Sequence, residues 1–72
     1  MNMKNINTQA LNEDEKRLVM SALNRYAEQC PSATEDNLQY FRVDYVKRLL
    51  KRKRSKMTEK AKILTDSILT KL

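Results

Sequence analysis

The sequence of 72 residues contains no histidine, no glycine and no tryptophan, and it has one cysteine and one proline. Without histidine there is no imidazole to act as a general base, to activate a nucleophile or to bind a metal. Without glycine, neither a P-loop nor a dinucleotide-binding fingerprint can form. These absences exclude most enzyme chemistry, and we expect no catalytic residue, no metal site and no cofactor.

The single cysteine, Cys30, cannot close an intramolecular disulfide or build a zinc site. It falls on an apolar helix face, where a small buried hydrophobe is the expected role, and a lone thiol fits a reducing compartment. No apolar run approaches the roughly 18 residues of a membrane span. The first residues, MNMKNINTQ, lack the apolar region of a signal peptide. We therefore expect a soluble, cytoplasmic protein and no membrane partner.

The length of the chain limits how much core it can build, because a domain of this size buries only about 60% of its unfolded surface. We expect one domain over residues 12–72, preceded by a flexible N-terminal tail over residues 1–11. The alternative for the start of the chain is a short strand of the kind found in ribbon-helix-helix dimers. Since so small a core is marginal, a homodimer that completes it is a further alternative.

The first helix is predicted over Glu13–Gln29. Asn12 and Glu15 have the spacing of a capping box, and Pro31 ends the pattern because the residue before proline avoids helical backbone angles. At about 100° per residue, the apolar positions of this stretch fall on one face. They are Leu11, Leu18, Val19, Ala22, Leu23, Tyr26 and Cys30.

A second helix is predicted over Glu35–Arg54, with Ser32 and Glu35 as a second capping box and Thr34 as the rival cap. Its apolar stripe is wide, which is typical of a helix that touches two neighbours. We therefore expect this helix to be the central one of the three. The stripe consists of Leu38, Phe41, Val43, Tyr45, Val46, Leu49 and Leu50.

The third helix is predicted over Thr58–Lys71, with Ser55 and Thr58 as candidate caps. No glycine or proline separates it from the second helix, so one continuous helix over Leu38–Leu72 is the alternative, and it would need a second chain to cover its apolar face. The favoured fold class is all-α, a small three-helix bundle. The stripe of the third helix consists of Met57, Ala61, Leu64, Ile68 and Leu72, and Ile63 points away from it.

The strongest functional signal is a run of positive charge with no acid in it. Residues 47–72 hold ten Lys/Arg against two acids, which is +8, and residues 1–46 hold five against seven, which is −2; together they give the net charge of +6. Two or three cations at a helix C-terminus offset the helix dipole, but seven within residues 47–56 exceed that need. The members of the run are Lys47, Arg48, Lys51, Arg52, Lys53, Arg54 and Lys56.

A polyanion is the expected partner of such a run. Lys47, Lys51 and Arg54 lie one turn apart on a helix and can meet successive phosphates, and Tyr40 is a candidate stacking residue beside them. We expect a small non-enzymatic regulatory or accessory protein that binds nucleic acid, DNA or RNA, through Lys47–Lys56. The alternative is a protein-binding inhibitor or adaptor that docks on an acidic surface of a larger, nucleic-acid-processing protein.

Overall fold

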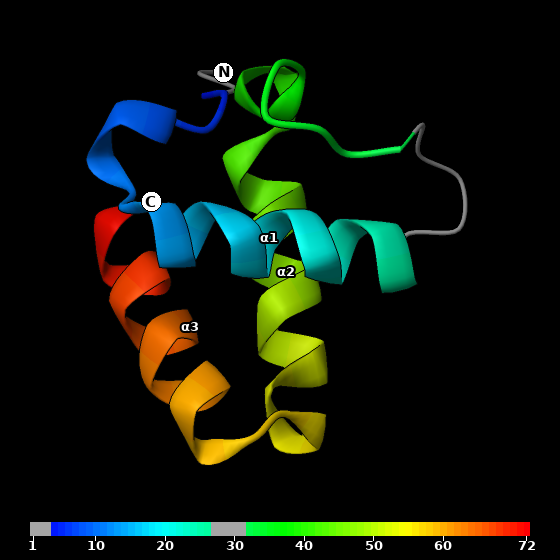
Figure 1. Cartoon of the computed structure of the whole chain (residues 1–72), viewed down its shortest axis with the longest axis vertical. Coiled ribbons are helices and arrows are strands. Elements are labelled where there is room, and N and C mark those ends of the chain that lie inside the picture. Colours follow the sequence, from blue (N-terminus) through cyan, green and yellow to red (C-terminus); the bar gives the residue numbers. More distant parts are fainter. Residues whose placement is uncertain (1–3, 27–31) are drawn as a thin grey trace.

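The computed structural model describes residues 4–26 and 32–72, and within these ranges every regular element is a helix (Figure 1). This confirms the predicted all-α, three-helix architecture. None of the described helices is long and apolar enough to cross a membrane. The elements in chain order are η1 (Thr8–Ala10), α1 (Glu13–Tyr26), η2 (Leu38–Tyr40), α2 (Val43–Lys53), η3 (Arg54–Lys56) and α3 (Glu59–Lys71), where η marks a short 3-10 helix.

Helix α1 begins where the capping box predicts. The Asn12 N–H donates to Glu15 Oε1 at 2.9 Å, and the Glu15 N–H donates to Asn12 Oδ1 at 2.8 Å. These two reciprocal bonds satisfy backbone donors that a helix start otherwise leaves unpaired. The predicted end of this helix, together with Cys30 and Pro31, lies outside the described residues.

The second predicted helix starts eight residues too early, because α2 begins at Val43 rather than at Glu35. The Thr34 N–H donates to Asn37 Oδ1 at 2.8 Å, and the Asn37 N–H donates to Thr34 Oγ1 at 3.2 Å. Short polar side chains of this kind compete with helical backbone bonds and favour a turn. Glu35 does not form the predicted capping box, and its carboxylate lies 3.5 Å from Lys16 Nζ instead.

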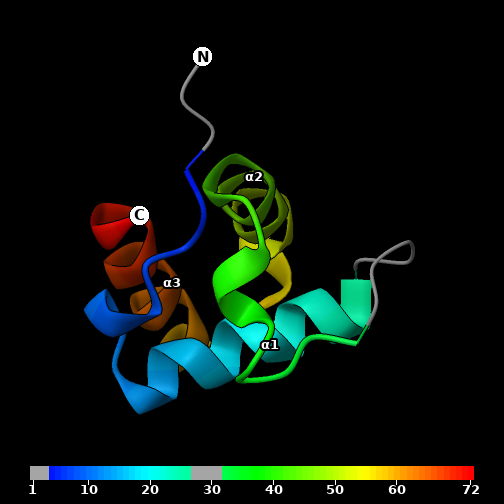
Figure 2. The same ribbon diagram turned by 90° about the horizontal axis from the view of Figure 1, so that it is seen from above.

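The N-terminal segment supplies the other reason for this late start. The Ile6 N–H donates to the Phe41 carbonyl and the Val43 N–H donates to the Lys4 carbonyl, both at 2.9 Å. These bonds hold Phe41 and Arg42 in extended conformations, so the helix can begin only after them. Figure 2 shows the N-terminal segment (blue) descending beside the start of α2 on its way to α1.

The prediction of a flexible tail over residues 1–11 is therefore wrong for residues 4–11. Ile6 is 3% exposed and Leu11 is 5% exposed, and both belong to the core. The predicted alternative, a strand, is reduced to a single antiparallel bridge between Asn5 and Arg42. Because the segment is mostly polar, its sequence contained little sign that Ile6 and Leu11 would be buried by the rest of the fold.

Helices α2 and α3 are separate, as the favoured prediction had it. Helix α2 tightens into η3, and Met57 then turns the chain with extended angles, φ −91° and ψ 157°. Thr58 caps α3 because its hydroxyl accepts a hydrogen bond from the Ala61 N–H at 3.2 Å. The chain therefore reverses at Met57–Thr58 without glycine or proline.

Helix α1, not α2, is the central helix. It crosses both other helices (Figure 1) and packs against both, whereas α2 and α3 meet chiefly through η3. The apolar stripe that suggested a central second helix is divided, since Leu38 and Phe41 lie outside α2. The buried core consists of Ile6, Leu11, Val19, Ala22, Leu23, Ala33, Leu38, Val46, Leu49, Leu50 and Ile68.

A buried carboxylate joins the start of α1 to the end of α3. The Glu15 side chain is fully buried, and it accepts hydrogen bonds from Ser67 Oγ at 2.8 Å and from Lys71 Nζ at 2.7 Å. Burial acts to raise the pKa of Glu15, but the hydrogen bonds from the Asn12 N–H, Lys71 and Ser67 outweigh it and leave the pKa below its usual value. The charged form therefore stabilises the junction of the two helices.

Candidate nucleic-acid interface

The seven cations of the predicted run form the end of the molecule at which α2 leads through η3 toward α3, at the bottom of Figure 1. Residues 47–62 hold nine Lys/Arg and one acid, Glu59, which gives this end a net charge of +8. Cations at the C-terminus of α2 also face the negative end of the helix dipole. We call the seven residues the basic end: Lys47, Arg48, Lys51, Arg52, Lys53, Arg54 and Lys56.

Five members of the basic end form neither an ion pair nor a cation–π contact within the part of the chain that the structure describes. On α2, Lys47 and Lys51 are four residues apart, as are Arg48 and Arg52, so they form two adjacent rows on the helix surface. All but Lys47 are exposed, and Lys47 is half-buried. The five residues are Lys47, Arg48, Lys51, Arg52 and Lys56.

Arg54 is engaged within the protein. Its Nε and Nη2 atoms donate to the two carboxylate oxygens of Asp66 in α3, each at 2.9 Å. The hydrogen bond from Arg54 holds the pKa of Asp66 below its usual value. A bidentate pair of this kind uses two of the five N–H donors of the guanidinium and offsets its charge with that of the carboxylate. Arg54 therefore links η3 to α3, and its charge is less available to a ligand than the charges of the unpaired cations.

Lys53 is also engaged. Its Nζ atom lies 4.8 Å from the centroid of the Tyr26 ring, which is within the range of a cation–π contact. Tyr26 belongs to α1, so this contact ties the end of α2 to the end of α1. The predicted row of Lys47, Lys51 and Arg54 is thus replaced by the four cations of α2 that remain unpaired over the described residues, with Lys56 beyond them.

The structure does not bring Tyr40 to the basic end. Tyr40 lies in η2, before α2, whereas the basic end begins at Lys47, in the second turn of that helix, and most of its members lie at the far end of α2 or in η3. The 11 residues of α2 span about 16 Å. Tyr40 is 70% exposed and lines an open hollow with Phe41, Arg42 and Tyr45. It is a surface aromatic at a separate place on the molecule.

The fold adds two exposed cations that the sequence run does not contain. Lys60 lies in the first turn of α3, directly after η3. Arg25 lies at the end of α1 and lines a pocket with Lys56. Arg25 reaches this place only because the second half of α1 faces η3 and the start of α3 across the pocket, so the local sequence around it contained no signal. The arrangement offers point charges and directional donors to an anion.

Comparison with protein-family models, with curated proteins and with solved structures finds no match, so no function is carried over from a relative. Residues 4–26 and 32–72 also contain no group of three or more Asp, Glu, Cys or His side chains placed to hold a metal ion.

Proposed function

We propose that this protein binds nucleic acid through its basic end, as a small non-enzymatic regulatory or accessory protein. The observation that carries the proposal is the set of five cations that form neither an ion pair nor a ring contact over the described residues, beside two acids, Glu59 and Asp66, that are already paired. Glu59 contacts Lys62 at 3.6 Å and Asp66 is held by Arg54. A surface with this excess of positive charge attracts a polyanion from outside the protein.

The geometry suits phosphates better than base edges. Lysines and arginines on adjacent rows of one helix contact a backbone of regularly spaced negative charges without reading the sequence. No element of the basic end presents Asn or Gln toward a groove, which base-specific reading by those side chains would require. The expected binding is therefore strong in low salt and only weakly dependent on sequence.

The salt dependence of binding gives the test. If the five free cations each neutralise one phosphate of a duplex, log K falls against log salt with a slope of roughly −4.5. We would measure fluorescence anisotropy with labelled duplex DNA, single-stranded DNA and RNA between about 50 and 200 mM salt. Micromolar binding that persists at the higher salt supports the proposal, and no binding to any of the three at the lower salt contradicts it.

An acidic protein surface is the alternative occupant of the basic end. The observation that favours it is Ile63, an apolar side chain of α3 that is 69% exposed, because protein interfaces combine apolar anchors with charge complementarity. Under this alternative the anisotropy titration shows no nucleic-acid binding, and Ile63→Asp weakens capture of a protein partner. Under the nucleic-acid proposal, Ile63→Asp leaves the salt slope unchanged.

A further inference from the structure

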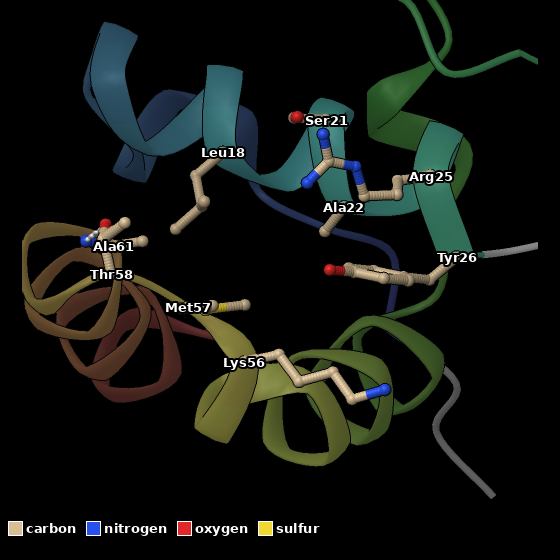
Figure 3. Close-up of a pocket in the computed structure, with 9 residues that line it drawn as sticks. All are labelled: Leu18, Ser21, Ala22, Arg25, Tyr26, Lys56, Met57, Thr58 and Ala61. Carbon is tan, nitrogen blue, oxygen red and sulfur yellow. Dashed lines mark hydrogen bonds between the residues drawn. The ribbon is translucent and has the colours of Figure 1, made fainter.

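A pocket of about 180 Å³ opens between α1, the end of η3 and the start of α3 (Figure 3). Its lining comes from three elements that are distant in the sequence, so it exists only in the folded chain. It is smaller than the roughly 300–1,000 Å³ clefts that enclose drug-sized ligands, and it suits one planar ring system. It is lined by Leu18, Ser21, Ala22, Arg25, Tyr26, Lys56, Met57, Thr58 and Ala61.

The interior of this pocket is largely apolar and has a polar edge. Figure 3 shows Leu18 reaching in from α1 and Met57 from the opposite side, with the Tyr26 hydroxyl directed toward the hollow between them. A hydroxyl can both donate and accept a hydrogen bond, so Tyr26 can pair with the edge of a heterocycle of either polarity. A flat ring with polar edges fits these surroundings better than an aliphatic chain does.

The pocket also lies within the positive surface. Lys56 belongs to the basic end, and Arg25 adds a second exposed cation from α1. Neither side chain forms an ion pair over the residues that the structure describes. A nucleotide combines a planar ring with adjacent negative charge, and under the proposed function that nucleotide belongs to a nucleic-acid strand. In a duplex the bases are stacked and paired, so only an unpaired base can enter.

We propose that this pocket receives one unpaired base of a single-stranded nucleic acid, while Arg25 and Lys56 contact the phosphates on either side of it. The proposal rests on the proposed function and deepens it, since it names single strands as the preferred partner. Aromatic and apolar contacts to bases tolerate any base type, so the pocket adds affinity for unpaired strands without defining a sequence.

The test compares two oligonucleotides of equal length and equal charge. One is a normal single strand, and the other carries abasic sites throughout, so that it keeps every phosphate and loses every base. Anisotropy is measured with the full chain and with two variants that fill the pocket, Ala61→Leu and Ser21→Leu. Ser21 is exposed, so its variant keeps the core intact if Ala61→Leu does not fold. Ala10→Leu, at an exposed position of η1, is the matched control.

For the unmodified protein we expect the normal strand to bind about tenfold more tightly than the abasic strand. Ser21→Leu and Ala61→Leu are expected to remove most of this difference while leaving the affinity for the abasic strand unchanged, and Ala10→Leu is expected to change neither. Circular dichroism verifies that each variant is folded. Removing the bases from the strand and filling the pocket of the protein form a double-mutant cycle. This cycle isolates the contact between pocket and base, because that contact is the only one that both changes remove.

Three results overturn the inference. Equal affinity for the two strands shows that no base is bound, yet the basic end still binds phosphates and the proposed function stands. A tenfold difference that survives both pocket-filling variants places the base elsewhere on the molecule. A failure of the unmodified protein to bind either strand in low salt overturns both the inference and the proposed function.

Discussion

At the scale of single residues, Glu15 shows how one side chain serves two levels of structure. Its spacing from Asn12 identified a capping box in the sequence, and the structure confirms the helix start to the residue. The sequence contained no sign that the same carboxylate would be buried, because Ser67 and Lys71 are 52 and 56 residues away. Residue spacing within a few positions can predict a helix cap. It cannot predict a hydrogen-bond partner that only the tertiary fold brings close.

Replacing Glu15 by Gln is expected to lower the free energy of unfolding by about 2 kcal/mol, because the variant keeps the size of the side chain but loses its charge-assisted bond to Lys71. Urea denaturation followed by circular dichroism gives the value. Glu13→Gln is the matched control, since Glu13 lies in the same helical turn and its side chain is 70% exposed. A change of less than about 0.5 kcal/mol in both variants would show that the buried junction does not stabilise the fold.

The stability of the protein is expected to fall in acid, partly through Glu15. A carboxyl group whose pKa in the folded state is below its usual value of 4.5 contributes stability above that value, and this contribution disappears as the pH falls through the folded-state pKa. The unfolding free energies of the unmodified protein and Glu15→Gln should therefore differ at pH 7 and converge below about pH 4.5. A difference between them that is constant from neutral pH to pH 2 contradicts this assignment.

At the scale of elements, the start of α2 and the N-terminal segment were the parts that sequence patterns placed least well. The helical periodicity began at Leu38, and the capping-box spacing placed the helix start at Glu35. In the structure Thr34 and Asn37 close a turn, and the segment around Ile6 keeps Phe41 and Arg42 extended. The backbone pairing between the N-terminal segment and residues 41–43 contributes to both errors, and the local turn of Thr34 and Asn37 is the second cause of the late start of α2. The helix starts that rest on local chemistry were predicted well: Asn12 caps α1 as expected, and of the two candidate caps for α3, Ser55 and Thr58, the structure has Thr58.

Truncating the anchor of the N-terminal segment tests this correction. Ile6→Ala is expected to lower the free energy of unfolding by about 2–4 kcal/mol, as other large-to-small substitutions in protein cores do. Thermal and urea unfolding measure the change. Asn5→Ala, at the neighbouring exposed position, should shift stability by less than about 0.5 kcal/mol. If Ile6→Ala were as harmless as Asn5→Ala, the segment would be a tail after all.

The pairing of Arg54 with Asp66 predicts that removing the carboxylate of Asp66 strengthens nucleic-acid binding by more than the change of one unit in net charge would. Asp66→Asn removes the carboxylate that holds the Arg54 guanidinium and leaves the residue size unchanged. We expect tighter binding to nucleic acid and a salt slope steeper by about 0.9, since Arg54 becomes available to one more phosphate of a duplex. Asp36→Asn, an exposed acid of the turn before η2, is the control with the same change of net charge. Equal effects of the two variants would show that Arg54 gains nothing from release.

At the scale of the whole molecule, the fold separates charge by position. The first turn of α1 contains three acids, Glu13, Asp14 and Glu15. The cations of α2, η3 and the first turn of α3 instead gather where these three elements follow one another. The sequence revealed this asymmetry directly, because the seven cations of the run lie within residues 47–56. It could not reveal that Arg54 and Lys53 are engaged internally, that Tyr40 lies apart, or that Arg25 joins Lys56 at a pocket, since each depends on how the helices cross.

The central claim is that the position of the cations, rather than the net charge of the chain, determines nucleic-acid binding. Lys51→Ala/Arg52→Ala removes two exposed cations of the basic end, and Lys4→Ala/Arg17→Ala removes two exposed cations elsewhere. Each double variant lowers the net charge from +6 to +4. The salt dependence of duplex DNA binding, measured by anisotropy, compares them. The first variant should flatten the slope by about 1.8, and the second should leave it unchanged. Equal slopes for the two variants would contradict the assignment of the interface to the basic end.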